Sequence, residues 1–245
     1  MHYTGPSFNL KTILKTAKVS DHTQKHLTKV YSLLLATVMA AFLGAWICMN
    51  MITLSPNLCT IGSVAGLAII MTMSCTQKRN TRLRVSLMIL FGFVEGICLS
   101  PLLKMANVVD ERIIATAFLG TATIFLCFSM AALTSKRRSF LYLGGILGST
   151  LMLLLFSSLL NVFFNSTFLF SIELYVGLAM FMGYVLFDTQ VIIEAAENGN
   201  DDFSWDAMKL FIDLVGIFVR ILIILIKLNS KKGNNSSKSP LEAIV

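Results

Sequence analysis

Charged side chains are scarce in this chain: 13% of its 245 residues are Asp, Glu, Lys or Arg, whereas 56% are hydrophobic. The mean hydropathy is +0.76. A soluble globular domain carries about 25% charged residues, so this shortage excludes an ordinary soluble fold. The composition indicates a protein that lies in a lipid bilayer.

Metal-binding and disulfide patterns are also missing. The five cysteines lie mostly in or beside apolar segments, and no two of them form a C-x-x-C pair. The three histidines (His2, His22 and His26) all lie in the polar first 28 residues. We therefore expect buried, unreactive thiols and no tightly bound zinc or similar metal. No cleavable signal peptide is expected either, because the first apolar run is already long enough to span a membrane.

The chain contains several long apolar runs. About 20 apolar residues cross a bilayer as a helix, whereas the strands of a barrel would alternate at every second residue. Six runs qualify, and a seventh is polar on one side. They lie within 30–77 (two runs, divided at Ser55-Pro56-Asn57), 85–103, 113–135, 139–172, 174–193 and 207–228. We predict an all-α membrane protein with seven transmembrane helices in residues 29–228. A basic cytosolic N-terminus (1–28) precedes them, and a polar basic tail (229–245) follows.

Basic residues predict the orientation. They gather in the N-terminus and in the second and fourth loops, at 78–84 and 136–138. By the positive-inside rule these segments face the cytosol, so the net charge of +7 is a topology signal rather than a nucleic-acid-binding face. Seven spans then place the C-terminus across the membrane, although its tail is basic. The alternative is a last segment that enters and returns with a break at Gly216, but its uninterrupted apolar length favours spanning.

Two carboxylates, Asp188 and Asp213, lie inside the last two apolar segments. A charge at membrane depth is unfavourable by several kcal/mol, so such residues usually face a protein interior and serve a function. At 100° per residue each aspartate falls in a narrow polar stripe of its helix, and two stripes are buried by packing together. The connecting loop is short, which puts both aspartates about 10–14 Å deep in antiparallel helices. The two stripes consist of Glu173, Gly177, Tyr184, Asp188 and Ala195, and of Asp206, Lys209, Asp213, Gly216, Arg220 and Lys227.

Contact between the two carboxyl groups would have a chemical consequence. In a poorly solvated site, two carboxyl groups within hydrogen-bonding reach share one proton instead of both ionising. The proton would hold the helices together, and its loss would let them separate or bind a cation such as calcium, which prefers oxygen ligands. The alternative is local bonding, of Asp188 with Thr189 or Gln190 and of Asp213 with Lys209.

The segment GYVLFDTQVIIEAAENG at 183–199 resembles the Bax inhibitor family, the transmembrane Bax-inhibitor-motif proteins. The resemblance extends to about residue 232 and includes TQKHL and KVY at 23–31, TAFLGTA at 116–122, YLGGIL at 142–147 and NVFF at 161–164. It implies a central last helix wrapped by six others, an endoplasmic-reticulum address and suppression of cell death. It also implies a pH-sensitive calcium leak gated by two aspartates, here Asp188 and Asp213.

Several supporting residues are expected around this pair. Some relatives hold the aspartates with an arginine in the second span, but that span has no basic residue here, so Arg220 is the candidate counter-charge. Lys209 and Tyr184 share the polar stripes with the pair. Glu95, alone in the third run between Gly92 and Gly96, either lines the same path or forms a hydrogen bond that packs helices.

The sequence thus favours a calcium leak protein of the endoplasmic reticulum that restrains apoptosis. We expect no enzymatic activity and no cofactor, with calcium as the permeant ion. The expected partners are the lipid bilayer, calcium ions and apoptosis-regulating membrane proteins. One alternative is a non-conducting regulator or scaffold that contacts partners through its basic tail and its acidic sixth loop. An intramembrane aspartyl protease is disfavoured, because such enzymes carry G-x-G-D and this chain has FDTQ and FIDL.

Overall fold

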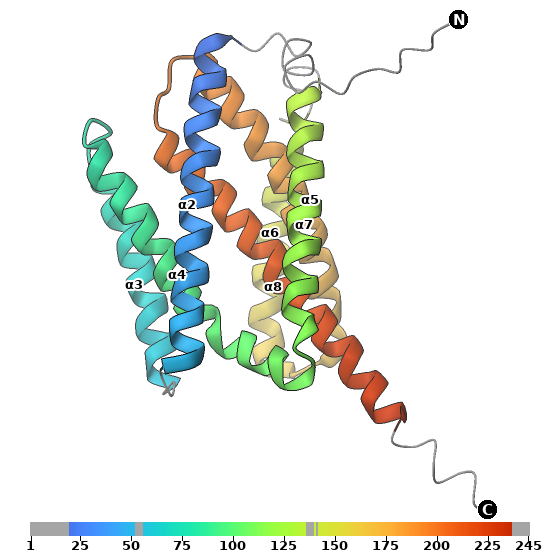
Figure 1. Cartoon of the computed structure of the whole chain (residues 1–245). Coiled ribbons are helices and arrows are strands. Elements are labelled where there is room, and N and C mark those ends of the chain that lie inside the picture. Colours follow the sequence, from blue (N-terminus) through green and yellow to red (C-terminus); the bar gives the residue numbers. More distant parts are fainter. Residues whose placement is uncertain (1–19, 52–55, 136–139, 141, 237–245) are drawn as a thin grey trace, which may run out of the picture.

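The computed structural model describes residues 20–51, 56–135, 140 and 142–236 as a bundle of helices, with no strand among them. Successive helices run up and down the bundle (Figure 1), as short connections between long apolar segments require. They are α2 (Asp21–Met51), α3 (Pro56–Cys75), α4 (Thr81–Val109), α5 (Arg112–Thr134), α6 (Leu143–Phe164), α7 (Thr167–Glu197) and α8 (Phe203–Ser236). The predicted all-α architecture is confirmed.

Five of these helices (α2, α4, α5, α6 and α7) are long and apolar enough to cross a membrane by length and composition. The apolar part of α3 within the described residues is shorter, at 62–75, and α8 carries charged side chains along its length. Large apolar side chains point outward on the bundle: Phe163 is 82% exposed and Leu153 is 71% exposed. Such an outer surface suits lipid rather than water, and the protein is an all-α membrane protein.

The last helix occupies the centre of the bundle, as predicted. In Figure 1, α8 crosses the bundle diagonally, and it packs against α2, α4, α5 and α7. Within the described residues, the backbone of α3 comes close only to that of α4, and the backbone of α6 only to that of α7. The wrapping is therefore uneven: four helices enclose α8, and two more stand outside them.

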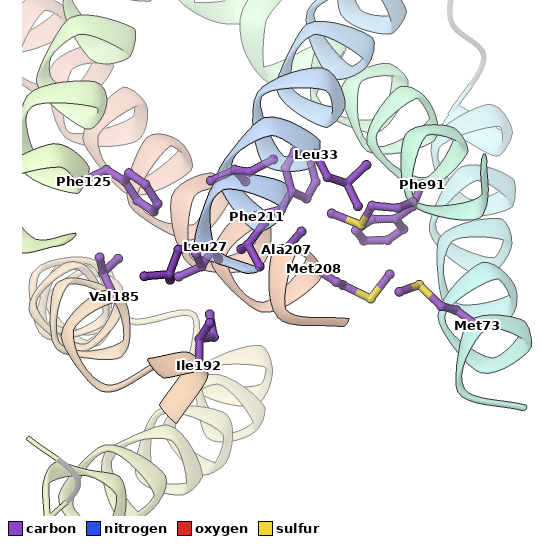
Figure 2. Packing of buried hydrophobic residues seen from close by; sticks show 14 of the residues in the cluster. Leu27, Leu33, Met73, Phe91, Phe125, Val185, Ile192, Ala207, Met208 and Phe211 are labelled. Carbon is purple, nitrogen blue, oxygen red and sulfur yellow. The ribbon is translucent and has the colours of Figure 1, made fainter. Parts of the chain in front are cut away.

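The main hydrophobic core lies where α8 meets its neighbours at the end where α8 begins (Figure 2). The ring of Phe211 on α8 packs edge-on against Phe91 on α4, with centroids 5.8 Å apart. The other labelled members come from α2, α3, α5, α7 and α8; they are Leu27, Leu33, Met73, Phe125, Val185, Ile192, Ala207 and Met208. This core holds α7 and α8 together beside the carboxylates predicted to be functional.

The path of α8 decides between spanning and re-entry. The helix continues without a break from Phe203 to Ser236, so the break at Gly216 that re-entry requires does not occur. It starts at the end of the bundle where α2 starts and finishes at the opposite end (Figure 1). The helices also extend beyond the predicted limits of 29 and 228, since α2 begins at Asp21 and α8 ends at Ser236. Most of the predicted basic N-terminus, and residues 237–245 of the tail, lie outside the described residues.

Candidate functional site: the interface between α7 and α8

Four of the charged residues of α8 are spaced seven apart, namely Asp206, Asp213, Arg220 and Lys227, and Lys209 lies between the first two. Seven residues are close to two helical turns of 3.6 residues each, so the four side chains share one face. The contacts below show that Asp213, Arg220 and Lys227 meet α7. We call this contact surface the α7–α8 seam. Its near half contains the two aspartates, and its far half contains the arginine and the lysine.

The structure brings the two predicted aspartates together in the near half. The carboxyl groups of Asp188 and Asp213 are in hydrogen-bonding contact, and Asp213 is 4% exposed. Oδ2 of Asp213 is buried and receives no hydrogen bond from any donor in the described part of the chain. Two ionised carboxylates have no hydrogen to donate, so a hydrogen bond between these groups would need a proton on one of them. The packing of polar stripes therefore predicted the meeting correctly.

The structure does not favour the alternative in which Asp188 bonds locally with Thr189 or Gln190. The side-chain amide of Gln190 donates to Ser135 Oγ at 2.6 Å and accepts from the backbone N–H of Phe140 at 2.8 Å. The Thr189 hydroxyl is buried, beside Tyr31 and Ser129 and on a different face of α7 from Asp188. Residues 189 and 190 thus connect α7 to other helices and leave Asp188 to α8.

Lys209 is the cation that acts on the pair. Its charge influences both Asp188 and Asp213, and its Nζ also lies 3.9 Å from Asp206 Oδ1. Because Lys209 stands one turn before Asp213 on the same face of α8, it interacts with carboxylates on both sides. The pair therefore has a nearby counter-charge, supplied by the residue that the local alternative named as the partner of Asp213.

Asp206 and His26 were not recognised as site residues from the sequence. His26 Nε2 lies 2.9 Å from Asp206 Oδ2, and both side chains are 3% exposed. All histidines were expected in the polar N-terminus, yet α2 carries this one into the bundle. The spacing of seven between Asp206 and Asp213 was the available signal for Asp206. No signal identified His26, whose partner lies 180 residues away in the sequence.

Tyr184 stands beside the aspartates, as predicted. Both Asp188 and Asp213 act on it electrostatically. Its ring packs between those of Phe181 and Phe187 on the same helix, with centroid distances of 6.3 and 6.4 Å. The ring of Phe181 thus contacts both Tyr184 and Arg220.

Arg220 does not reach the aspartates, so the predicted counter-charge is not where it was expected. Its Nη1 donates to the carbonyl of Gly216 at 3.1 Å, and its guanidinium lies 4.4 Å from the centroid of the Phe181 ring. It packs against Gly177, where an added Cβ would overlap the guanidinium. It forms no ion pair with any carboxylate among the described residues. Seven residues place it about 10 Å beyond Asp213 along the helix.

The far end of the seam holds Lys227. Its Nζ donates to Ser171 Oγ at 2.5 Å and lies 5.8 Å from the Phe170 ring. Glu173, which was predicted to face α8, instead accepts hydrogen bonds from Ser157 at 2.6 Å and Ser158 at 3.1 Å on α6. The far half therefore carries positive charge without a facing carboxylate.

Glu95 is not brought to the pair by the described contacts. It is half-buried on α4 and forms no hydrogen bond or ion pair within the described ranges. The flanking glycines allow close packing, since a Cβ on Gly92 or Gly96 would collide with the α2 backbone at Thr37 or Ala41. The suggestion that Glu95 lines a cation path stays a prediction.

The acidic loop between α7 and α8 is partly used inside the protein. Asp202 forms a buried ion pair with Arg84 of α4 at 2.9 Å, and Arg84 also donates to the Thr76 carbonyl at 3.1 Å. Together with buried Asp206, this removes two carboxylates from the surface that the scaffold alternative requires. Among the described residues, no group of three or more His, Cys, Asp or Glu side chains is arranged to hold a metal ion.

These features define a class: an all-α membrane protein whose central helix α8 carries one member of a carboxyl pair, the buried Asp213. Comparison with known proteins identifies the family. The family described as "Inhibitor of apoptosis-promoting Bax1" matches residues 23–231. The chain is 40% identical to human Bax inhibitor 1, over 97% of this chain and 100% of the relative. It is 38% identical to Arabidopsis thaliana Bax inhibitor 1, over 92% of this chain and 90% of the relative. The chain belongs to this family, as the resemblance predicted.

Proposed function

We propose that this protein restrains cell death as a multi-pass protein of the endoplasmic-reticulum membrane, and that it acts as a pH-sensitive calcium leak gated by Asp188 and Asp213. Full-length similarity to proteins named Bax inhibitor 1 supports the role in cell death. The contact between the two carboxyl groups in the near half of the seam carries the proposal for the gate.

The gate works through one shared proton. With the proton present, the carboxyl groups bond to each other and fasten α7 to α8. Loss of the proton leaves two negative charges in contact at low dielectric, where their repulsion is much stronger than in water. The helices then separate or accept a cation between the carboxylates. Calcium takes 6–8 oxygen ligands, so two carboxylates completed by water suit a passing ion better than a resident one.

The charged neighbours of Asp188 and Asp213 influence whether the two carboxyl groups keep their shared proton. The positive charge of Lys209 favours ionised carboxylates, whereas the negative charge of Asp206 opposes a second charge on Asp188. His26 bonds to Asp206 and thereby links α2 to this balance. With the N-terminus in the cytosol, as the basic loops favour, the near half of the seam lies towards the cytosol and the far half towards the lumen.

Calcium flux from liposomes that contain only the purified protein, measured across a range of pH, tests the proposal directly. Wild-type protein is expected to conduct calcium in a pH-dependent manner. Asp213→Asn preserves size and hydrogen bonding but removes the shared titration, so its flux should no longer depend on pH. Asp188→Asn should behave alike, and the double variant should add little because the two residues act as one unit. Asp201→Asn, at an exposed aspartate, is the matched control.

The same experiment separates the scaffold alternative. A non-conducting regulator would show no calcium flux at any pH, while cells that express Asp213→Asn would keep their resistance to death stimuli. Equal pH dependence in the wild type and both single variants would refute the gate. Additive effects of the two substitutions would show that the aspartates act separately.

A further inference from the structure

The charge of the α7–α8 seam reverses along its length. At successive two-turn steps along α8 the side chains are Asp206, Asp213, Arg220 and Lys227, so two acidic positions are followed by two basic ones. Any cation that leaves the aspartate pair along the seam towards the C-terminal end of α8 therefore meets positive charge. The first such charge is Arg220, about 10 Å beyond Asp213.

Arg220 is fixed in the seam by contacts that do not neutralise it. Its guanidinium donates to the Gly216 carbonyl and lies on the face of Phe181. Phe181 itself packs against Gly216, and Gly177 provides the space that the guanidinium fills. A guanidinium remains protonated in proteins, and here no described carboxylate pairs with it. The side chain thus fills the space beside Gly177 and carries a permanent positive charge.

We propose that Arg220 is the barrier of the leak: it closes the far side of the aspartate site and limits the rate at which a divalent cation passes. This role differs from that of a counter-charge, because the residue acts on the ion and not on the proton of the pair. The inference rests on the proposed calcium leak. It assigns separate tasks to the two halves of the seam, with proton sensing at Asp188 and Asp213 and resistance to cations at Arg220.

Depth distinguishes Arg220 from the second positive residue. Arg220 stands 17 residues after Phe203 and 16 residues before Ser236, near the middle of α8. Lys227 stands two turns nearer to the C-terminal end of α8, and its flexible stem lets the ammonium reach towards the interface and water. A charge in water repels calcium weakly, whereas one fixed in the low-dielectric interior repels it strongly. Arg220 therefore dominates the barrier.

Calcium flux from liposomes tests this role with four substitutions. Arg220→Gln should raise the flux roughly tenfold and leave its pH dependence in place. Gly177→Ala should also raise the flux, because the added methyl group displaces the guanidinium. Arg220→Lys keeps a positive charge and should stay closest to wild type, which also shows that the position tolerates replacement. Lys227→Gln, the matched control on the same seam, should change the flux much less.

A second measurement does not depend on conduction. Tyr184→Cys, in a chain whose five native cysteines are serine, places a thiol beside the pair. A positively charged thiol reagent added from the side of the α8 C-terminus should react slowly relative to a negatively charged reagent of equal size. Arg220→Gln should raise the ratio of the two rates roughly tenfold.

The outcomes separate the two proposals. If the wild type leaks calcium in a pH-dependent manner and Arg220→Gln changes neither the flux nor the ratio of thiol-modification rates, the barrier is refuted and the leak stands. If the wild type conducts no calcium, the proposed function fails, and with it the barrier of a leak, even where the ratio shows that Arg220 repels cations. Loss of pH dependence in Arg220→Gln would overturn the separation of tasks and make Arg220 part of the gate.

Discussion

The two halves of the α7–α8 seam accommodate charge in different ways. In the near half, Asp188 and Asp213 face each other across the helices, Lys209 and Asp206 act on Asp188 electrostatically, and His26 bonds to Asp206. In the far half, Arg220 relies on a carbonyl of its own helix and an aromatic ring. A carboxylate can lose its charge by taking a proton, whereas a guanidinium cannot. The first half can therefore switch, and the second half keeps a fixed charge.

The largest expected effect comes from breaking the buried support of the near half. His26→Leu leaves the Asp206 carboxylate buried with only Lys209 nearby at 3.9 Å. Leaving a buried acceptor without its hydrogen-bond donor typically lowers stability by about 1–3 kcal/mol, and more when the acceptor is charged, so we expect a loss of about 3 kcal/mol. Thermal unfolding in detergent measures the loss. His22→Leu removes the exposed partner of Asp201 and should change stability little; equal losses would refute the structural role of His26.

A second test concerns the proton of the near half. In the proposed gate, the folded protein holds a proton between Asp188 and Asp213 that the unfolded chain releases at neutral pH, so the folded state would bind more protons. Stability should therefore fall as pH rises, by about 1–2 kcal/mol between mildly acidic and mildly basic solution. Asp213→Asn should flatten this dependence. Melting temperatures measured at several pH values check it, and an unchanged slope in the variant would show that the pair shares no proton.

Packing in the far half offers a smaller effect. A methyl group at Gly216 would overlap the Phe181 ring on which Arg220 rests. Overpacking should outweigh the gain in helix propensity, giving a net loss of about 1 kcal/mol for Gly216→Ala. Gly145→Ala on α6 meets no atom within 4 Å and should be neutral or slightly stabilising. Identical melting temperatures for the two variants would mean that the far half is loosely packed.

The smallest effect is expected at Lys227. Lys227→Met removes the bond to Ser171 but keeps an apolar side chain of similar length. Because a half-buried ammonium near the membrane surface exchanges this bond for water, the change in stability should be below about 1 kcal/mol. Thermal unfolding of this variant beside Gly216→Ala shows whether the far half depends more on packing than on polar bonds.

The spacing of apolar and polar residues predicted much of this site, because the side on which a residue lies in its own helix can be calculated from the sequence. Apolar run lengths placed the helices, and the positions of Asp188 and Asp213 on their stripes placed them at one interface. Periodicity cannot say which of several neighbours a stripe will meet. Glu173 sits at the edge of its stripe and bonds to serines of α6, and Arg220 meets Gly177 and Phe181 instead of a carboxylate. The burial of His26 could not be predicted from its own segment, because it depends on packing against α8, which lies far along the chain.

The central position of the last helix has a consequence for biosynthesis. Helices enter the membrane in the order of synthesis, so α2 through α7 are made before the element around which four of them pack. Until the last part of the chain has been made, Arg84 lacks its partner, which lies 118 residues downstream, and His26 lacks its partner, which lies 180 residues downstream. Asp188 likewise has no partner until Asp213 of α8 has been made. A nascent chain that stops before Asp202 thus has none of these three partners, which marks it as incomplete for the machinery that degrades unfinished membrane proteins.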